Sequence, residues 1–167
     1  LQEVSGFGNN AVSLIMLVYG VSVAFGNIYG GKMADRMGPI RALTVIFSGL
    51  IAILLMLTLS AAHPIAAVLT VLIWGAFAFG NVPGLQVYVV QQAERFVPEA
   101  VDIASGLNIA AFNIGIALGS VIGGYVVDGM QLTDTAWMGA GIVALALALT
   151  QLSGHWDRQR ESDVTTR

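Results

Sequence analysis

Amide and aromatic side chains recur along a long uncharged segment, residues 64–92, and appear again in a second such segment, residues 103–127. An amide can hydrogen-bond a polar group and an aromatic face can cover an apolar one, so the combination suits a cavity wall for a partly apolar solute. The candidates are Trp74, Phe77, Asn81, Gln86, Tyr88, Asn108, Phe112 and Asn113. Asn108, Phe112 and Asn113 fit a central cavity and a contact with a neighbouring helix equally well. For the others, the alternative is aromatic packing inside a helix bundle.

The first of these segments also contains the stretch GNVPG, residues 80–84. Pro83 has no backbone N–H, and its ring crowds the carbonyl of Phe79, four residues earlier. We therefore expect a helix kink at Pro83 and Gly84, or a local opening of the helix. Backbone that opens within a membrane is stable only where protein or water satisfies its polar groups, which favours a cavity there. A kinked helix packed closely on its neighbours explains the stretch as well.

No set of residues suited to catalysis or metal binding accompanies these side chains. The sequence has no cysteine, no nucleophile paired with a base and no phosphate-binding loop. Its two histidines, His63 and His155, fall at expected helix ends, where solvated caps are commoner than metal ligands. The formal charge of −3 includes no basic face for nucleic acid. We therefore expect no enzyme, no metal, no cofactor and no nucleic-acid partner.

Composition and charge indicate that the elements carrying these residues are membrane helices. The chain is 56% hydrophobic and 10% charged, with a mean hydropathy of +0.79, whereas a soluble domain is about 25% charged. Four spans carry no charge, and each is long enough for the roughly 20 apolar residues of one crossing. The second span, residues 42–93, is long enough for two and divides at SAAHP, residues 60–64. We predict an all-α polytopic membrane bundle, a single domain over residues 1–167, with helices at about 11–31, 42–60, 64–92, 103–127 and 135–154 and a tail at 155–167.

All seven lysine and arginine residues fall on one side of the membrane if these helices alternate in direction. Positive residues beside membrane helices are retained on the cytoplasmic side, so we predict an external N-terminus and a cytoplasmic C-terminus. Trp137 and Trp156 are spaced as anchors at the two membrane interfaces would be. The seven positive residues are Lys32, Arg36, Arg41, Arg95, Arg158, Arg160 and Arg167.

Small residues recur at spacings of three or four on two of the predicted helices, where they permit close helix packing. Ser22, Gly26 and Gly30 form a row on the first helix. Rows on the fourth helix, including one that starts at Ala111 and reaches Gly123, predict that neighbours enclose this helix on two sides. Such surfaces also suit helices that slide during a conformational cycle. The second and fifth helices lack polar faces and are expected to face lipid.

The charged stretch GGKMADRMGPIRA, residues 30–42, resembles the loop signature of the major facilitator superfamily. In that signature a glycine, an Asp-Arg pair, a second glycine and basic residues join two helices on the cytoplasmic side. Residues 105–128 look like the eleventh helix of the arabinose-efflux-permease-like, drug:proton antiporter branch, and the start of the chain resembles its eighth helix. The matching positions of the loop are Gly31, Asp35, Arg36, Gly38 and Arg41.

The resemblance covers nearly the whole chain and implies helices eight to twelve of a twelve-helix transporter, which is a C-terminal half without its first helix. It implies proton-coupled efflux of a small amphipathic or sugar-like solute by alternating access, in a bacterial-type inner membrane. Asp35 would dock on a helix N-terminus of the other half and so act as part of a gate, while Arg36 and Arg41 would anchor the loop. The implied partners are membrane lipid, the missing N-terminal half and a small-molecule solute.

The proton-carrying residue is expected in the missing half, because no ionisable group lies inside any of the predicted helices. The alternative function is a non-transporting membrane scaffold, or a partner-binding fragment that folds beside another chain. The upstream reading frame distinguishes the two functions, since seven further hydrophobic spans favour the transporter.

Overall fold

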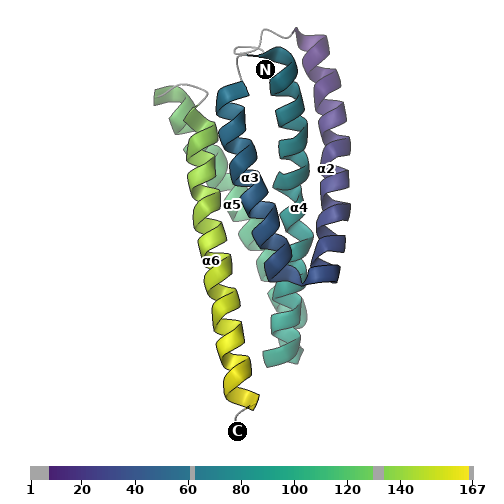
Figure 1. Cartoon of the computed structure of the whole chain (residues 1–167), viewed down its shortest axis with the longest axis vertical. Coiled ribbons are helices and arrows are strands. Elements are labelled where there is room, and N and C mark those ends of the chain that lie inside the picture. Colours follow the sequence, from purple (N-terminus) through teal and green to yellow (C-terminus); the bar gives the residue numbers. More distant parts are fainter. Residues whose placement is uncertain (1–7, 61–62, 130–133, 166–167) are drawn as a thin grey trace.

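The computed structural model of the chain describes residues 8–60, 63–129 and 134–165. These residues form five long helices and one short 3-10 turn, with no strand among them (Figure 1). Each long helix is long and apolar enough to cross a membrane. The predicted all-α bundle with five membrane helices is therefore confirmed. The elements are α2 (Asn9–Met37), α3 (Pro39–Ser60), α4 (Pro64–Phe96), η1 (Pro98–Ala100), α5 (Val101–Gly129) and α6 (Asp134–Thr165).

The helices extend beyond the bounds expected from the uncharged spans. In particular, α2 continues through the charged stretch to Met37, and α3 begins at Pro39, so only Gly38 separates them. Gly38 has a φ of +82°, which glycine adopts without a steric penalty, and a proline fits the first turn of the helix that follows. The expected loop at residues 32–41 is thus a sharp helical corner. The last helix likewise extends through most of the expected tail, because helical hydrogen bonds persist where the apolar run has ended.

Helix α4 is one continuous helix with Pro83 in its interior, so the expected opening of the backbone does not occur there. Neighbouring helices contact this part of α4 closely. A Cβ atom on Gly31 of α2 would lie 3.7 Å from Cβ of Pro83, and one on Gly84 would lie 3.1 Å from Cδ2 of Leu43. A bend of α4 at Pro83 and Gly84 remains a prediction.

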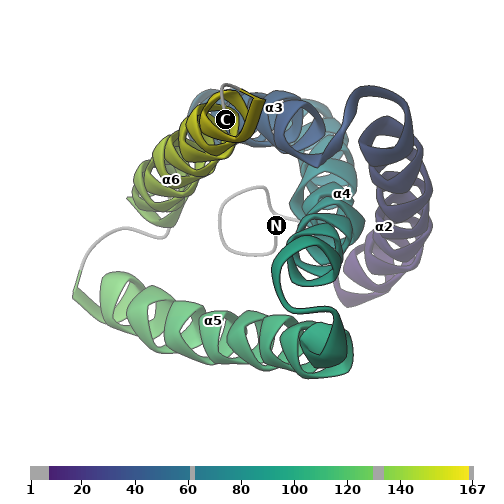
Figure 2. The same ribbon diagram turned by 90° about the horizontal axis from the view of Figure 1, so that it is seen from below.

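The five helices alternate in direction (Figure 1), and α4 lies next to α2, α3 and α5 (Figure 2). It packs extensively on α2 and α3 and less on α5. Helix α3 packs between α4 and α6. Helix α5 lies to one side in Figure 2, and its contact with α6 is slight. A group of three helices, α2, α3 and α4, therefore forms the most closely packed part of the bundle.

The contact between α2 and α4 is built on small residues. Ser22 Oγ donates a hydrogen bond to the carbonyl oxygen of Leu72. One and two turns further along, Gly26 meets Ala76 and Gly30 meets Gly80, so closely that a Cβ atom on either α2 glycine would overlap a backbone carbonyl of α4. Because the two helices run in the same direction, their backbones stay in contact over several turns. The predicted packing role of this row of small residues on α2 is confirmed.

Helix α3 packs against other helices more than was expected: it carries most of the buried side chains among the described residues, while Val45, Met56 and Leu59 stay exposed. Seven of its residues are buried, and Leu50 and Leu54 form a core cluster with Ala140 of α6. Hydropathy could not reveal this, since lipid and a neighbouring helix are equally apolar surroundings. The buried residues are Ala42, Leu43, Ile46, Phe47, Leu50, Ile53 and Leu54.

Helix α5 is not enclosed on two sides within this chain. Val126 is its one buried residue among those described. Cβ atoms added to Gly115, Gly119 or Gly123 would meet no atom of the described chain within 4 Å. The expectation of two flanking neighbours is therefore wrong for these five helices, because the small residues of α5 face away from them.

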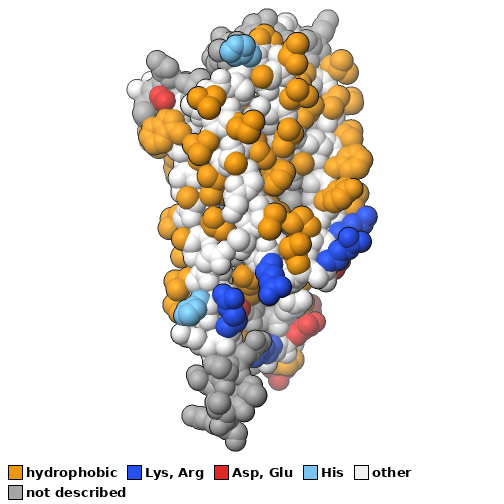
Figure 3. Space-filling view, in the orientation of Figure 1, with side chains coloured by type: hydrophobic (Ala, Val, Ile, Leu, Met, Phe, Trp, Pro, Cys, Tyr) orange, Lys and Arg blue, Asp and Glu red, His pale blue; other side chains and the backbone are white. Residues whose placement is uncertain are grey.

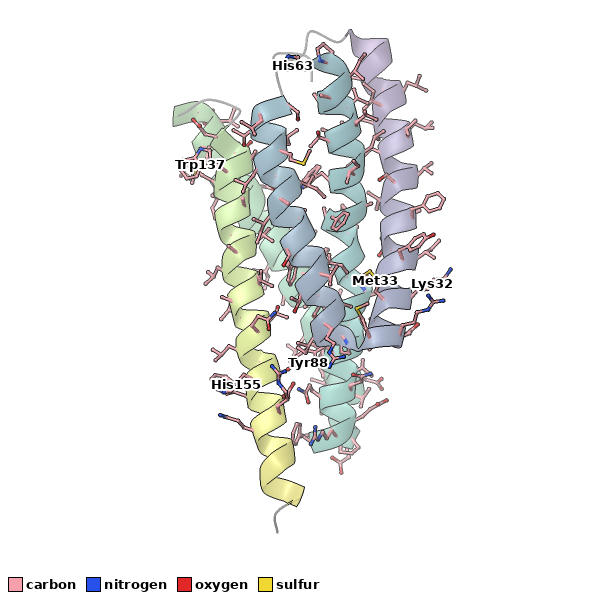
Figure 4. The ribbon with its side chains drawn as sticks, viewed as in Figure 1. Lys32, Met33, His63, Tyr88, Trp137 and His155 are labelled. Atoms are coloured by element: carbon pink, nitrogen blue, oxygen red, sulfur yellow. The ribbon has the colours of Figure 1, made fainter. Side chains whose placement is uncertain are left out.

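The basic side chains of the described residues gather at one end of the bundle. Figure 3 shows lysine and arginine side chains near the C-terminal end, below a broad apolar belt. They come from the last turns of α2 and α4, the start of α3 and the later part of α6. His63 and Trp137 lie at the opposite end (Figure 4). The charge pattern therefore divides the bundle into a basic end and a weakly charged end.

Candidate solute-contact site

A network of polar side chains joins α4 to α5. Asn108 Nδ2 donates a hydrogen bond of 2.7 Å to Gln86 Oε1, and Gln86 Nε2 donates one of 2.5 Å to Ser105 Oγ. All three side chains are partly buried. In apolar surroundings a polar group without a hydrogen bond is costly, so these bonds hold the two amides in a defined orientation. Helix α5, which otherwise packs loosely, is thus attached to α4 by polar contacts.

A cavity of about 220 Å³ lies against this network. Gln86 and Asn108 form its polar side, and Phe112 and Asn113 form part of the rest. Asn113 is held by a hydrogen bond of 2.9 Å from its Nδ2 to the carbonyl oxygen of Ile109. The structure therefore brings together four of the eight predicted cavity residues. The full lining is Val82, Leu85, Gln86, Asn108, Ile109, Phe112 and Asn113.

The other predicted cavity residues lie elsewhere on α4. Trp74 and Phe77 pack against the core cluster of Leu50, Leu54 and Ala140. The Trp74 ring also contacts the Tyr19 ring of α2, with centroids 5.8 Å apart. The surroundings of Trp74 match the aromatic packing that was the alternative to a cavity wall, whereas Phe77 also lines a separate, apolar cavity.

Asn81 and Tyr88 are also separate from the cavity. Asn81 Nδ2 donates to the carbonyl oxygen of Ala78 in its own helix, at 2.9 Å. Tyr88 belongs to a second polar cluster near the basic end: its Oη donates to Asp157 Oδ2 at 2.9 Å and accepts from Gln92 Nε2 at 2.9 Å. The contact with Asp157 ties α4 to α6 near the basic end, where Figure 4 labels Tyr88.

Sequence reasoning missed Ser105 and Asp157. Ser105 stands in a row of small residues, and nothing in its immediate neighbours marks it as a partner of Gln86. Asp157 fell in the expected tail, whereas it lies in α6 and accepts the Tyr88 hydrogen bond. Both depend on which helices pack together, and a single sequence does not contain that information. The spacing of Ser105 and Asn108, one helical turn apart, was the only available signal.

The residues of the predicted gate surround the corner between α2 and α3. Asp35 and Arg36 are exposed in the last turns of α2, and Arg41 is exposed in the first turn of α3. Gly38 forms the corner, and Gly31 lies against Pro83 of α4. The exposed positions of Asp35 and Arg36 leave both side chains accessible to another part of a larger protein.

The part of the chain that the structure describes contains no group of three or more metal-ligating residues. Its chemistry consists of polar contacts between apolar helices that are long enough to span a membrane. These features define a polytopic membrane protein with a small cavity between two helices, lined by apolar side chains and three amides. The family model of the Major Facilitator Superfamily matches residues 1–165, and the chain belongs to that superfamily.

Curated relatives are named as MFS-type transporters or as transport proteins. The chain is 50% identical over 161 residues to the uncharacterized MFS-type transporter YtbD of Bacillus subtilis, covering 96% of this chain and 39% of YtbD. It is 35% identical over 145 residues to the inner membrane transport protein YdhP of Escherichia coli, covering 85% of this chain and 36% of YdhP. No solved structure matches the chain. The chain thus spans about two fifths of the length of these relatives.

Proposed function

We propose that this chain is the C-terminal part of a secondary active transporter and supplies one wall of its solute pathway. The Gln86–Asn108–Ser105 network beside a cavity is the observation that carries the proposal. Transporters of this kind bind solute near the middle of the membrane, at the interface between structural repeats. The relatives are named as transporters, and this chain covers only part of their length.

The chemistry of the cavity supports a small amphipathic or sugar-like solute. Gln86, Asn108 and Asn113 offer amide donors and acceptors, while Phe112 and the aliphatic lining offer apolar contact. A hydroxyl-bearing solute could exchange hydrogen bonds with the network without leaving a buried amide unpaired. None of these side chains titrates, so a proton-coupled cycle would take its proton carrier from outside this wall.

The corner between α2 and α3 is our candidate for the gate. Aspartate near the positive end of a helix dipole is stabilised by about 0.3 to 1 kcal/mol when exposed. Exposed Asp35 would make such a contact with a helix of the N-terminal half in one state of the alternating-access cycle. Arg36 and Arg41 would hold the corner at the membrane surface. The corner residues Gly31 and Gly38 would fix its shape.

The basic end of the bundle is our candidate for the cytoplasmic end. Lysine and arginine side chains near membrane helices are retained on the cytoplasmic side, and those of the described residues gather there (Figure 3). The membrane would be a bacterial inner membrane, as the name of the relative YdhP states for that protein. We propose that the protein exports its solute in exchange for protons that enter down their gradient.

Transport by the full-length protein in proteoliposomes tests the proposal. A panel of sugars and amphipathic compounds would be screened for movement driven by an imposed pH gradient. Gln86→Ala and Asn108→Ala should weaken the apparent affinity for the transported solute by about tenfold, because each leaves a polar group unpaired. Gln151→Ala is the matched control, since this amide binds Thr44 Oγ1 at 2.8 Å away from the cavity. Equal effects of all three changes would contradict the assignment of the wall, and a full-length protein that moves no solute would contradict transport.

A further inference from the structure

A second cavity lies beside the α2–α4 contact and shares no residue with the solute-contact site. It is an apolar groove of about 310 Å³ with walls from three helices. Its lining includes Phe25, Tyr29 and Met33 of α2, Ile46 of α3, and Phe77 of α4. Apart from the Tyr29 hydroxyl, these side chains offer only apolar contact. The groove therefore suits a hydrocarbon occupant.

The small residues of α2 explain why the groove exists. Gly26 and Gly30 bring α2 directly against α4, whereas α2 contacts α3 much less. The groove lies between α2 and α3, which separate from each other on the surface of α4. Phe25 and Tyr29 stand at its rim and are 58% and 62% exposed. Large aromatic side chains exposed at this level of a membrane helix face lipid unless a partner covers them.

Positive charge adjoins one end of the groove. Lys32 Nζ lies 5.7 Å from the centroid of the Tyr29 ring, and in Figure 4 Lys32 points outward from α2 at the level of Met33. Arg36 follows Lys32 by one turn and is exposed. At about 100° per residue, Arg36 falls about 20° from Tyr29 around α2 and Lys32 about 60° from it, whereas Asp35 falls about 120° from Tyr29. The two cations therefore lie nearer to the groove than the carboxylate of Asp35 does.

We propose that this groove binds an acyl chain of an anionic glycerophospholipid, with the lipid phosphate held by Lys32 and Arg36. The groove follows α2 from Phe25 to Met33, about 12 Å at 1.5 Å per residue, which is close to the roughly 15 Å depth of one leaflet. Lys32 lies beside the Met33 end of the groove and Arg36 about one turn beyond it, where the head group would be. Basic side chains at this boundary attract anionic lipids, and a neutral lipid offers them no net charge. The proposal does not depend on which solute the protein transports.

Photoreactive lipids test this site in the full-length protein. The protein would be placed in phosphatidylcholine nanodiscs that contain a small amount of phosphatidylglycerol with a diazirine in its acyl chain. We expect cross-links on the peptides around residues 25–33 and 76–80. The double change Lys32→Gln and Arg36→Gln should lower this labelling about tenfold, since each cation contributes to the attraction of an anionic lipid.

Two controls keep the result specific. Arg95→Gln with Arg158→Gln removes the same charge from the same end of the bundle and should leave labelling of these peptides unchanged. A phosphatidylcholine probe with the same diazirine should label them weakly, and its signal should not respond to Lys32→Gln and Arg36→Gln. Equal labelling by both probes, loss of labelling in both double variants, or no labelling of these peptides would each overturn the proposal. The last result would mean that a protein segment covers the groove.

Discussion

Gly30 of α2 lies directly against the backbone of Gly80 of α4, so that a Cβ atom on Gly30 would overlap the Gly80 carbonyl oxygen. The same relationship recurs one turn earlier between Gly26 and Ala76. Lipid gives no hydrophobic reward for bringing helices together, so this close backbone contact supplies much of the attraction between α2 and α4. It also sets the distance between α2 and α3, and hence the width of the apolar groove.

Replacing Gly30 by leucine should separate α2 from α4. The added side chain has no space against a backbone carbonyl, and overpacking of this kind costs about 1 to 3 kcal/mol or more. We expect a clearly lower unfolding temperature for the purified protein. Gly20→Leu is the matched control on the same helix, because a Cβ at Gly20 meets nothing within 4 Å. A Gly30→Leu protein as stable as the Gly20→Leu protein would contradict this helix contact.

The hydrogen bond between Gln86 and Asn108 should appear as an energetic coupling of the two residues. Interhelical hydrogen bonds in membrane proteins contribute about 0.6 kcal/mol on average and up to about 1.7 kcal/mol. A double-mutant cycle of Gln86→Ala and Asn108→Ala, measured by unfolding in detergent, should give a coupling in that range. A second double-mutant cycle, of Gln86→Ala and Gln151→Ala, should give no coupling energy, because Gln151 belongs to a separate contact with Thr44. Additive effects of Gln86→Ala and Asn108→Ala would show that the network does not join α4 to α5.

Tyr88→Phe should loosen the basic end of α6. The hydroxyl joins Gln92 of α4 to Asp157 of α6, and the loss of a hydrogen bond to a charged group costs about 1.5 to 3 kcal/mol. Amide hydrogen exchange around Asp157 should become about tenfold faster. Tyr125→Phe, on an exposed ring of α5, removes the same hydroxyl elsewhere and should leave this exchange unchanged. Unaltered exchange in Tyr88→Phe would contradict a role of this contact in holding α6.

The number and type of the helices followed from the sequence because charge is so unevenly distributed along it. Gaps in charge locate apolar helices, and five such helices are present in the described structure. Their ends were harder to place, since a helix such as α2 continues past Lys32 and Arg36 to Met37. Charge marks where a helix leaves the hydrocarbon, whereas backbone conformation marks where it ends.

The neighbours of each helix could not be predicted from composition. The sequence of α3 predicts a lipid-facing helix, whereas α3 is the most buried helix of the described structure. Hydropathy does not distinguish the two cases, because lipid and protein are equally apolar surroundings for a leucine. The candidate site could be predicted only in part, because its amides are visible in the sequence but the helices that pack beside them are not. Gln86 and Asn108 stood out as amides in apolar segments, but their partner Ser105 and the separation of Trp74 and Phe77 from them depend on helix packing.

Single-cysteine labelling measures most directly whether these helices are threaded through a membrane with the basic end inside. The chain has no cysteine, so each introduced thiol is unique within it. Met37→Cys and His63→Cys place exposed thiols at the basic and the weakly charged ends. A membrane-impermeant maleimide added to intact cells should label position 63 and not position 37, and in inverted vesicles the pattern should reverse. Labelling of both positions from the same side, or of position 37 from outside, would contradict the account.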